Sequence, residues 1–254
     1  MTLTPLKEKP ENIMRELVKN AKKQFKDRLL LVGAKGSLAR NEFTPYSDFD
    51  LVIIVDDEKL EQWSEFMYNT TYFDIQIISL KNVLKKISTV KFYWPAEVGG
   101  KLNLKIYYDN KNTFERLKKE YKTIAKNKKM FEGVVNLNTI IEYFSKSIRY
   151  YENREFVNLR WACLTLFEEF SMVLGLLNQR YFIQQGPTAK IKEISKFKYL
   201  PVGWKVISQN LVSENPEKNI AGAKQLMRLL DELSKKHSFT NYKIYSIQDI
   251  KFKI

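Results

Sequence analysis

Three aspartates carry the most informative chemistry in this sequence. Asp48 and Asp50 stand two residues apart where an apolar run begins, and Asp74 lies inside a later run of β-branched and aromatic residues. Alternate residues of a strand point to one face, so Asp48 and Asp50 are predicted to project together, roughly 7 Å apart along the chain. Neighbouring carboxylates repel unless a cation lies between them, and such oxygen donors suit Mg²⁺. The pattern therefore predicts a divalent-metal site.

Asp74 is predicted to complete this acidic group. It lies between Phe73 and Ile75 and alternates with them, which places it on the polar face of its strand. There it could bind the metal, or it could accept the proton of a hydroxyl group. The competing interpretation is a solvated strand residue that pairs with a lysine.

A second group lies upstream of the aspartates. Gly36 and Ser37 follow the first apolar run and are predicted to precede a short helix. Glycine lets the backbone approach a phosphate closely, and a helix N-terminus offers free N–H groups to an anion. Ser37 adds a hydroxyl donor. Arg40 could reach a phosphate, cap the end of the helix or pair with an acid.

These residues need a sheet to position them. Apolar and β-branched runs predict strands at 29–32, 51–55, 72–79 and 102–108. The last strand is predicted to be entered through Gly99 and Gly100. Helical spacing predicts helices at 11–27, 58–68 and 111–130. Asp48 and Asp50 then stand at the entrance of the second strand, and Asp74 lies within the third.

Beyond Gly133 the strand signals fade. Helical periodicity runs over 134–177, and a break follows at Gln185-Gly186-Pro187. Further helices are predicted at 189–196, 204–211 and 217–236. We therefore predict an α+β protein, with a small mixed β-sheet flanked by helices in residues 1–130 and an all-α helical bundle in residues 134–254.

The order and spacing of these motifs resemble a known superfamily. Gly36-Ser37, a gap of nine residues, and then Ser47-Asp48-Phe49-Asp50 opening an apolar strand, with a later acid in a strand, are similar to the polymerase-β-type nucleotidyltransferases. Kanamycin and lincosamide nucleotidyltransferases, which carry a helical C-terminal domain, are the most similar in plan. The sequence departs from the common pattern at Asn41, where many relatives have glycine, and at Phe49, where an aliphatic residue is usual.

The resemblance implies a transferase that moves a nucleoside monophosphate, with ATP as the expected donor and Mg²⁺ or Mn²⁺ as the metal. Asp48, Asp50 and Asp74 would bind the metal and act in catalysis. Nucleotide-binding residues would come from both halves of the chain: Gly36, Ser37, Arg40, Ser47 and Lys190. A lysine at about the position of Lys190 often steadies the β- and γ-phosphates in relatives.

Composition bounds the remaining possibilities. The 254 residues carry a net charge of +14, which favours polyanionic partners unless the excess lysines only solvate the surface. The lone Cys163 cannot form an intrachain disulfide, and no apolar run reaches the roughly 18 residues of a membrane span. The N-terminal segment has no apolar signal core. We therefore expect a cytoplasmic protein without membrane partners.

Other residue types yield weaker hypotheses. His237 is predicted to lie on the surface. The single histidine and single cysteine are too few to form a zinc site or a histidine-dependent triad. Glu168 and Glu169 interrupt an apolar helix. We expect one of them to pair with Arg149 or Arg160, and catalytic participation as a base is the alternative. The aromatic residues of the second half are predicted to be core rather than a nucleobase platform: Trp161, Tyr181, Phe182 and Trp204.

The acceptor is the least determined part of the function. A small hydroxylated molecule of the aminoglycoside type is the first expectation, because the chain is short and similar in plan to such enzymes. An RNA 3′ end or a protein hydroxyl is the alternative that the net charge favours. A non-catalytic, antitoxin-like regulatory partner is a third hypothesis, against which the three intact carboxylates argue. A homodimer is left open.

Overall fold

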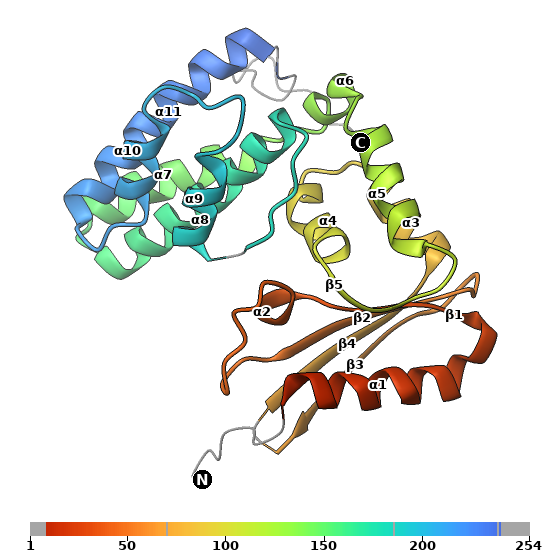
Figure 1. Cartoon of the computed structure of the whole chain (residues 1–254). Coiled ribbons are helices and arrows are strands. Elements are labelled where there is room, and N and C mark those ends of the chain that lie inside the picture. The colour runs from red at the N-terminus through yellow and green to blue at the C-terminus, as the bar shows by residue number, and fades with distance from the viewer. Residues whose placement is uncertain (1–8, 70, 185, 238, 240–254) are drawn as a thin grey trace, which may run out of the picture. The chain divides into compact units, whose positions relative to one another are not determined.

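The computed structural model describes residues 9–69, 71–184, 186–237 and 239. These residues form two compact units (Figure 1). The described residues of the first unit fall within 9–90, 94–127 and 181–184, and those of the second within 91–93, 128–180 and 186–239. The boundary between the sheet-bearing part and the helical part therefore lies at about residue 127.

The first unit is built on a five-stranded sheet. Its strands are β1 (Leu29–Ala34), β2 (Phe49–Val55), β3 (Glu61–Tyr68), β4 (Thr71–Ser79) and β5 (Lys105–Asp109). Their order in space is β3-β4-β2-β1-β5. The central strands β2 and β4 are parallel, whereas the other neighbours are antiparallel. The sheet is therefore mixed, as the sequence predicted.

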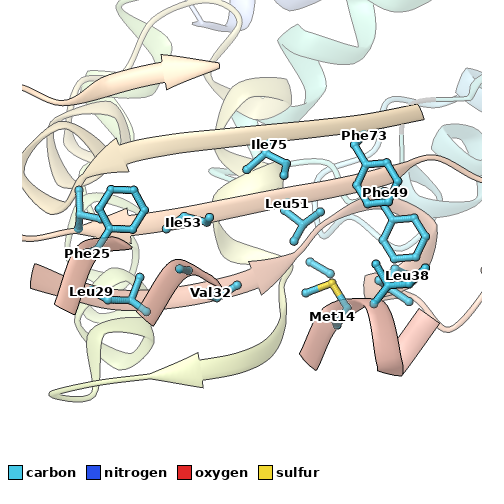
Figure 2. Packing of buried hydrophobic residues seen from close by; sticks show 14 residues of the cluster. Met14, Phe25, Leu29, Val32, Leu38, Phe49, Leu51, Ile53, Phe73 and Ile75 are labelled. Atoms are coloured by element: carbon cyan, nitrogen blue, oxygen red, sulfur yellow. The ribbon is translucent and has the colours of Figure 1, made fainter. Parts of the chain in front are cut away.

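Helices cover both faces of this sheet (Figure 1). One face is covered by α1 (Pro10–Phe25), which begins with proline at a position where no backbone N–H is needed. The other carries α3 (Leu80–Ser88), α4 (Trp94–Leu102) and α5 (Thr113–Ile124). Figure 2 shows Phe25 of α1 at the Ile53 end of the sheet and Met14 nearer Leu51, within one cluster of buried residues. This apolar layer buries the α1 face of the sheet, and the other face also buries apolar residues, such as Val52, Ile54 and Ile78.

The second unit is helical within the part of the chain that the structure describes. Its helices are α6 (Lys128–Glu132), α7 (Asn138–Glu152), α8 (Phe156–Leu177), α9 (Pro187–Ile194), α10 (Trp204–Leu211) and α11 (Pro216–His237). The long apolar α8 contributes the largest share of buried residues, and α7, α10 and α11 pack against it. The predicted α+β class, a sheet-bearing part followed by a helical part, is confirmed.

Two predictions about the first unit are wrong. Residues 61–68 were expected within a helix but form β3, which pairs with β4 along its whole length. Gly99 and Gly100 were expected to lead into a strand but lie inside α4, where Gly99 has no room for a side chain because the Phe182 carbonyl oxygen approaches it. In both places tertiary packing overrides local propensity.

The described helices also bear on the membrane question. None of them has the length and apolar character that a membrane crossing requires.

Candidate functional site

Asp50 and Asp74 lie opposite each other on the two parallel central strands. The pairing of β2 with β4 sets Phe49 beside Phe73 and Asp50 beside Asp74. The residues before and after each aspartate are buried in the core on the α1 face (Figure 2). Because side chains alternate along a strand, both carboxylates point to the opposite face of the sheet.

Stacked phenylalanine rings reinforce this register. Phe49 and Phe73 stack with centroids 4.8 Å apart, and Phe66 of β3 stacks on Phe73 at 5.0 Å. Such cross-strand aromatic pairs stabilise one alignment of neighbouring strands. The unusual aromatic residue between the two aspartates therefore takes part in placing Asp50 across from Asp74.

Asp48 lies just ahead of β2 and is exposed. The loop before it is shaped by Ser47, whose hydroxyl accepts a hydrogen bond from the Thr44 backbone N–H at 3.0 Å. Ser47 thus contributes to the turn that leads to Asp48. Its predicted contact with a nucleotide stays a prediction.

Gly36 lies directly against the Asp50 carboxylate. It has a φ of 59°, and a Cβ atom at this position would lie 2.3 Å from Asp50 Oδ2. The preceding Lys35 N–H donates to the Asp50 carbonyl at 2.7 Å, which ties the end of β1 to β2. Gly36 and Ser37 form the first turn of the short helix α2 (Gly36–Ala39) rather than preceding it, and Ser37 is half-buried there.

Sequence reasoning allowed Asp74 a lysine partner but did not identify it as Lys35. Its ammonium lies 3.3 Å from Asp74 Oδ2, and only 18% of its side chain is exposed. The other oxygen, Asp74 Oδ1, is buried and makes no hydrogen bond to any described residue. A lysine at the end of an otherwise apolar strand, directly before Gly36, was the signal that could have found it.

The electrostatics of Asp50 reflect this crowding. Burial raises the pKa of the Asp50 carboxyl, and the nearby Asp74 and Asp48 carboxylates raise it further. The Lys35 ammonium is the largest opposing influence and lowers this pKa, with a smaller contribution from Arg40. Asp50 therefore lies within the negative field of both other acids, in a place that favours a cation.

The residues fit a hard divalent ion in their chemistry. All three candidates are carboxylates, and the unbonded Asp74 Oδ1 is a ready oxygen donor. Their arrangement is incomplete, because no three His, Cys, Asp or Glu side chains among the described residues are placed to hold a metal ion. Asp50 and Asp74 face each other, Asp48 lies out on the loop, and Lys35 already neutralises Asp74.

Two predicted phosphate ligands are engaged elsewhere. Arg40 Nε donates to Glu42 Oε2 at 2.7 Å, so the arginine pairs with an acid. Lys190, in the second unit, is 1% exposed and forms an ion pair with Glu168. Glu168 therefore pairs with a lysine rather than with the expected Arg149 or Arg160, and Arg160 pairs with Glu214.

Glu169 is the other buried acid of the helical unit. It is 7% exposed, and its Oε1 accepts a hydrogen bond from the Tyr93 hydroxyl at 2.8 Å. Its Oε2 is buried without a hydrogen-bond partner among the described residues. Burial raises the pKa of Glu169, although the hydrogen bond from Tyr93 opposes that rise. The residue is therefore a buried acid whose charged form is disfavoured, rather than a surface acid.

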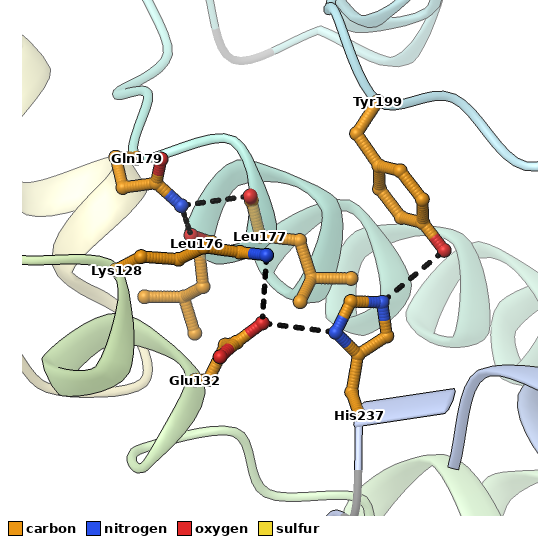
Figure 3. Close-up of polar contacts among 7 residues, drawn as sticks. All are labelled: Lys128, Glu132, Leu176, Leu177, Gln179, Tyr199 and His237. Carbon is orange, nitrogen blue, oxygen red and sulfur yellow. Dashed lines mark hydrogen bonds and ion pairs between the residues drawn. The ribbon is translucent and has the colours of Figure 1, made fainter. Parts of the chain in front are cut away.

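The prediction that His237 lies on the surface is wrong. Its side chain is 7% exposed, and the ring nitrogens contact Glu132 Oε1 at 2.9 Å and the Tyr199 hydroxyl at 3.3 Å. Figure 3 shows Lys128 on the same Glu132 carboxylate. The histidine therefore joins the end of α11 to α6 and to the segment before α10. Of the predicted core aromatic residues, Phe182 and Trp204 are buried, whereas Trp161 is exposed.

Comparison with known proteins addresses the same part of the chain. Residues 14–142, about half of the sequence, match the family model described as "Nucleotidyltransferase domain". No curated protein matches the sequence. A crystal structure of a nucleotidyltransferase-like protein from Exiguobacterium sibiricum is similar over 93% of this chain and 83% of that chain, with 12% identity and a TM-score of 0.47.

Proposed function

The chain belongs to the nucleotidyltransferase domain family, and we propose that it transfers a nucleoside monophosphate from a nucleoside triphosphate to an acceptor hydroxyl. The observation that carries this proposal is the register of β2 with β4, which sets Asp50 beside Asp74 next to Gly36. All these residues lie within the range that matches the family. The resemblance inferred from the sequence is confirmed at the level of this family.

The reaction we propose is an in-line displacement at phosphorus. The acceptor oxygen forms a bond to the α-phosphorus, the bond from that phosphorus to the β-phosphate oxygen breaks, and pyrophosphate leaves. A divalent ion, when bound, would supply positive charge that offsets the negative charge of the phosphate oxygens. Asp48 and Asp50 would hold that ion, and Asp74 would complete the site or take the proton of the hydroxyl. Ser37 would donate to a phosphate oxygen.

The finer identity of the substrates is also a proposal. ATP is the donor and a small hydroxylated molecule is the acceptor, as in the kanamycin and lincosamide nucleotidyltransferases that the chain resembles in plan. The order of the units supports this assignment, since a mixed sheet with the Gly-Ser and Asp-x-Asp motifs is followed by a helical unit. Arg40, Ser47 and Lys190 stay candidate nucleotide ligands.

Transfer of label tests the proposal. The protein is incubated with each α-labelled nucleoside triphosphate, Mg²⁺ and a panel of aminoglycosides, other polyols and short RNAs. We expect label on a small hydroxylated acceptor and equimolar pyrophosphate. Asp48→Asn together with Asp50→Asn should abolish both products while the far-UV circular dichroism is retained. Label that stays in the triphosphate with every acceptor, or transfer that survives the double substitution, contradicts the proposal.

RNA is the second candidate acceptor, and the net charge of +14 favours it. A protein that guides an RNA end into its site must bind the RNA backbone through several cations. Affinity for RNA would then fall steeply with salt, with a log–log slope of about −0.7 for each neutralised phosphate of a single strand. A slope near zero, with label on a polyol, removes this alternative.

A further inference from the structure

The ammonium group of Lys35 lies in the acidic site, where a cation is expected. Lys35 Nζ bonds to Asp74 Oδ2 at 3.3 Å, and the same ammonium opposes the negative field at Asp50. Both side chains are mostly covered, with 18% of Lys35 and 25% of Asp74 exposed. This ion pair is therefore not one of the surface pairs that contribute almost nothing.

Lys35 is held both at its backbone and at its ammonium group. Its backbone N–H donates to the Asp50 carbonyl, and Gly36 follows at once with its left-handed φ. Along the way, the Lys35 Cδ lies 3.6 Å from the point where a Cβ of Gly100 would stand, so the stem runs beside α4. The side chain thus crosses from the end of β1, over β2, to Asp74 on β4.

Neighbouring lysines are directed elsewhere. Lys101 donates to the Glu97 carbonyl at 2.9 Å, and burial, with Lys86 and Lys35 nearby, lowers the pKa of Lys101 to about 8. Lys86 forms its ion pair with Glu61. Lys101 therefore serves as a matched lysine of similar surroundings that does not contact the aspartates.

We propose that Lys35 is the resident cation at Asp74, so that the protein binds a single divalent ion, through Asp48 and Asp50. This proposal rests on the metal-dependent function proposed above. It agrees with the finding that no three His, Cys, Asp or Glu side chains among the described residues are placed to hold a metal ion. A second ion at Asp74 would have to displace a half-buried ammonium and leave it without a counter-charge, which is unfavourable.

The number of bound Mn²⁺ ions tests the assignment. We expect the wild-type protein, titrated with Mn²⁺ alone and followed by electron paramagnetic resonance, to bind one ion. Lys35→Met should bind two, because Asp50 and Asp74 then face each other without a cation. Lys35→Met combined with Asp74→Asn should return to one, and Lys35→Arg should stay at one. Lys101→Met is the control and should bind one.

Other outcomes overturn the proposal. A wild-type protein that binds no ion, or that binds two, contradicts it, as does a folded Lys35→Met that still binds one. Failure of the proposal about Lys35 can be distinguished from failure of the proposed function. Two bound ions with normal label transfer reject only the role of Lys35, whereas one bound ion without label transfer on any acceptor rejects only the function.

Discussion

Gly36 shows how one absent side chain shapes the site. A residue with a side chain would place its Cβ 2.3 Å from Asp50 Oδ2 and would hold an unfavourable φ of 59°. Gly36→Ala should therefore displace the Asp50 carboxylate and lower the free energy of unfolding by about 1–2 kcal/mol from the backbone alone. Urea unfolding measures the stability, and Mn²⁺ titration measures the site.

The control for this prediction is Gly186→Ala. Gly186 has open space around its Cβ position and an ordinary φ of −67°. It should change stability by less than about 1 kcal/mol and leave Mn²⁺ binding as it was. If both glycine variants bind Mn²⁺ equally well, Gly36 does not support Asp50 in the way described.

Glu169 gives the helical unit a dependence on pH. Its pKa is raised by burial above the ordinary 4.5, so above about pH 4.5 the folded chain keeps a proton that the unfolded chain has lost. The free energy of unfolding should then fall as pH rises from 4.5 to the raised pKa. Glu169→Gln has no such proton and should gain stability relative to the wild type over that interval.

Urea unfolding of both proteins between about pH 4 and about pH 8 measures this difference. Tyr93→Phe is the companion variant. It removes the hydrogen bond that opposes the rise of the pKa, so the fall in stability should extend to higher pH. A constant difference between wild type and Glu169→Gln at every pH would show that Glu169 does not titrate in this interval.

At the scale of elements, strands β1, β2 and β4 could be predicted because they are buried and strongly apolar. The edge strand β3 could not. Its residues are mostly exposed, so no alternation of buried and exposed positions marks it, and its identity comes from pairing with β4. The helix α3 was missed although its N-cap is visible in the sequence, where Ser79 Oγ accepts a hydrogen bond from the Asn82 N–H at 3.1 Å.

The candidate site, like the sheet, could be predicted from the sequence only in part. The pattern of alternation placed Asp74 on the polar face of its strand, and the burial of Phe73 and Ile75 agrees. The ion pair of Asp74 with Lys35 joins residues 39 positions apart in the chain, and no local pattern reports such a contact. For the same reason the burial of His237 against Glu132 was invisible in the sequence.

The polar contacts of His237 should hold the end of α11 to the end of α6 and to Tyr199 (Figure 3). His237→Ala leaves the half-buried Glu132 and the Tyr199 hydroxyl without this partner, and should lower the free energy of unfolding by about 1–3 kcal/mol. Urea unfolding followed by circular dichroism measures the loss.

Arg160→Ala is the matched variant, since it removes the exposed ion pair with Glu214 and should cost no more than about 1 kcal/mol. Equal losses in the two variants would contradict a special role for His237.

At the scale of the whole molecule, a concentrated negative site lies in a strongly positive chain. The net charge of +14 attracts a triphosphate, whereas Asp48, Asp50 and Asp74 repel it unless a cation intervenes. Binding of nucleotide and binding of the divalent ion should therefore support each other. Such coupling is expected of a metal-dependent nucleotidyltransferase. It is not expected of a basic protein that binds anions only through its positive charge.

Calorimetric titration of the protein with ATP, with and without Mg²⁺, measures that coupling directly. We predict binding that requires Mg²⁺ and that Asp48→Asn together with Asp50→Asn abolishes in a folded protein. Binding of equal affinity without Mg²⁺, or binding that the double substitution leaves unchanged, would contradict the assignment of these two aspartates.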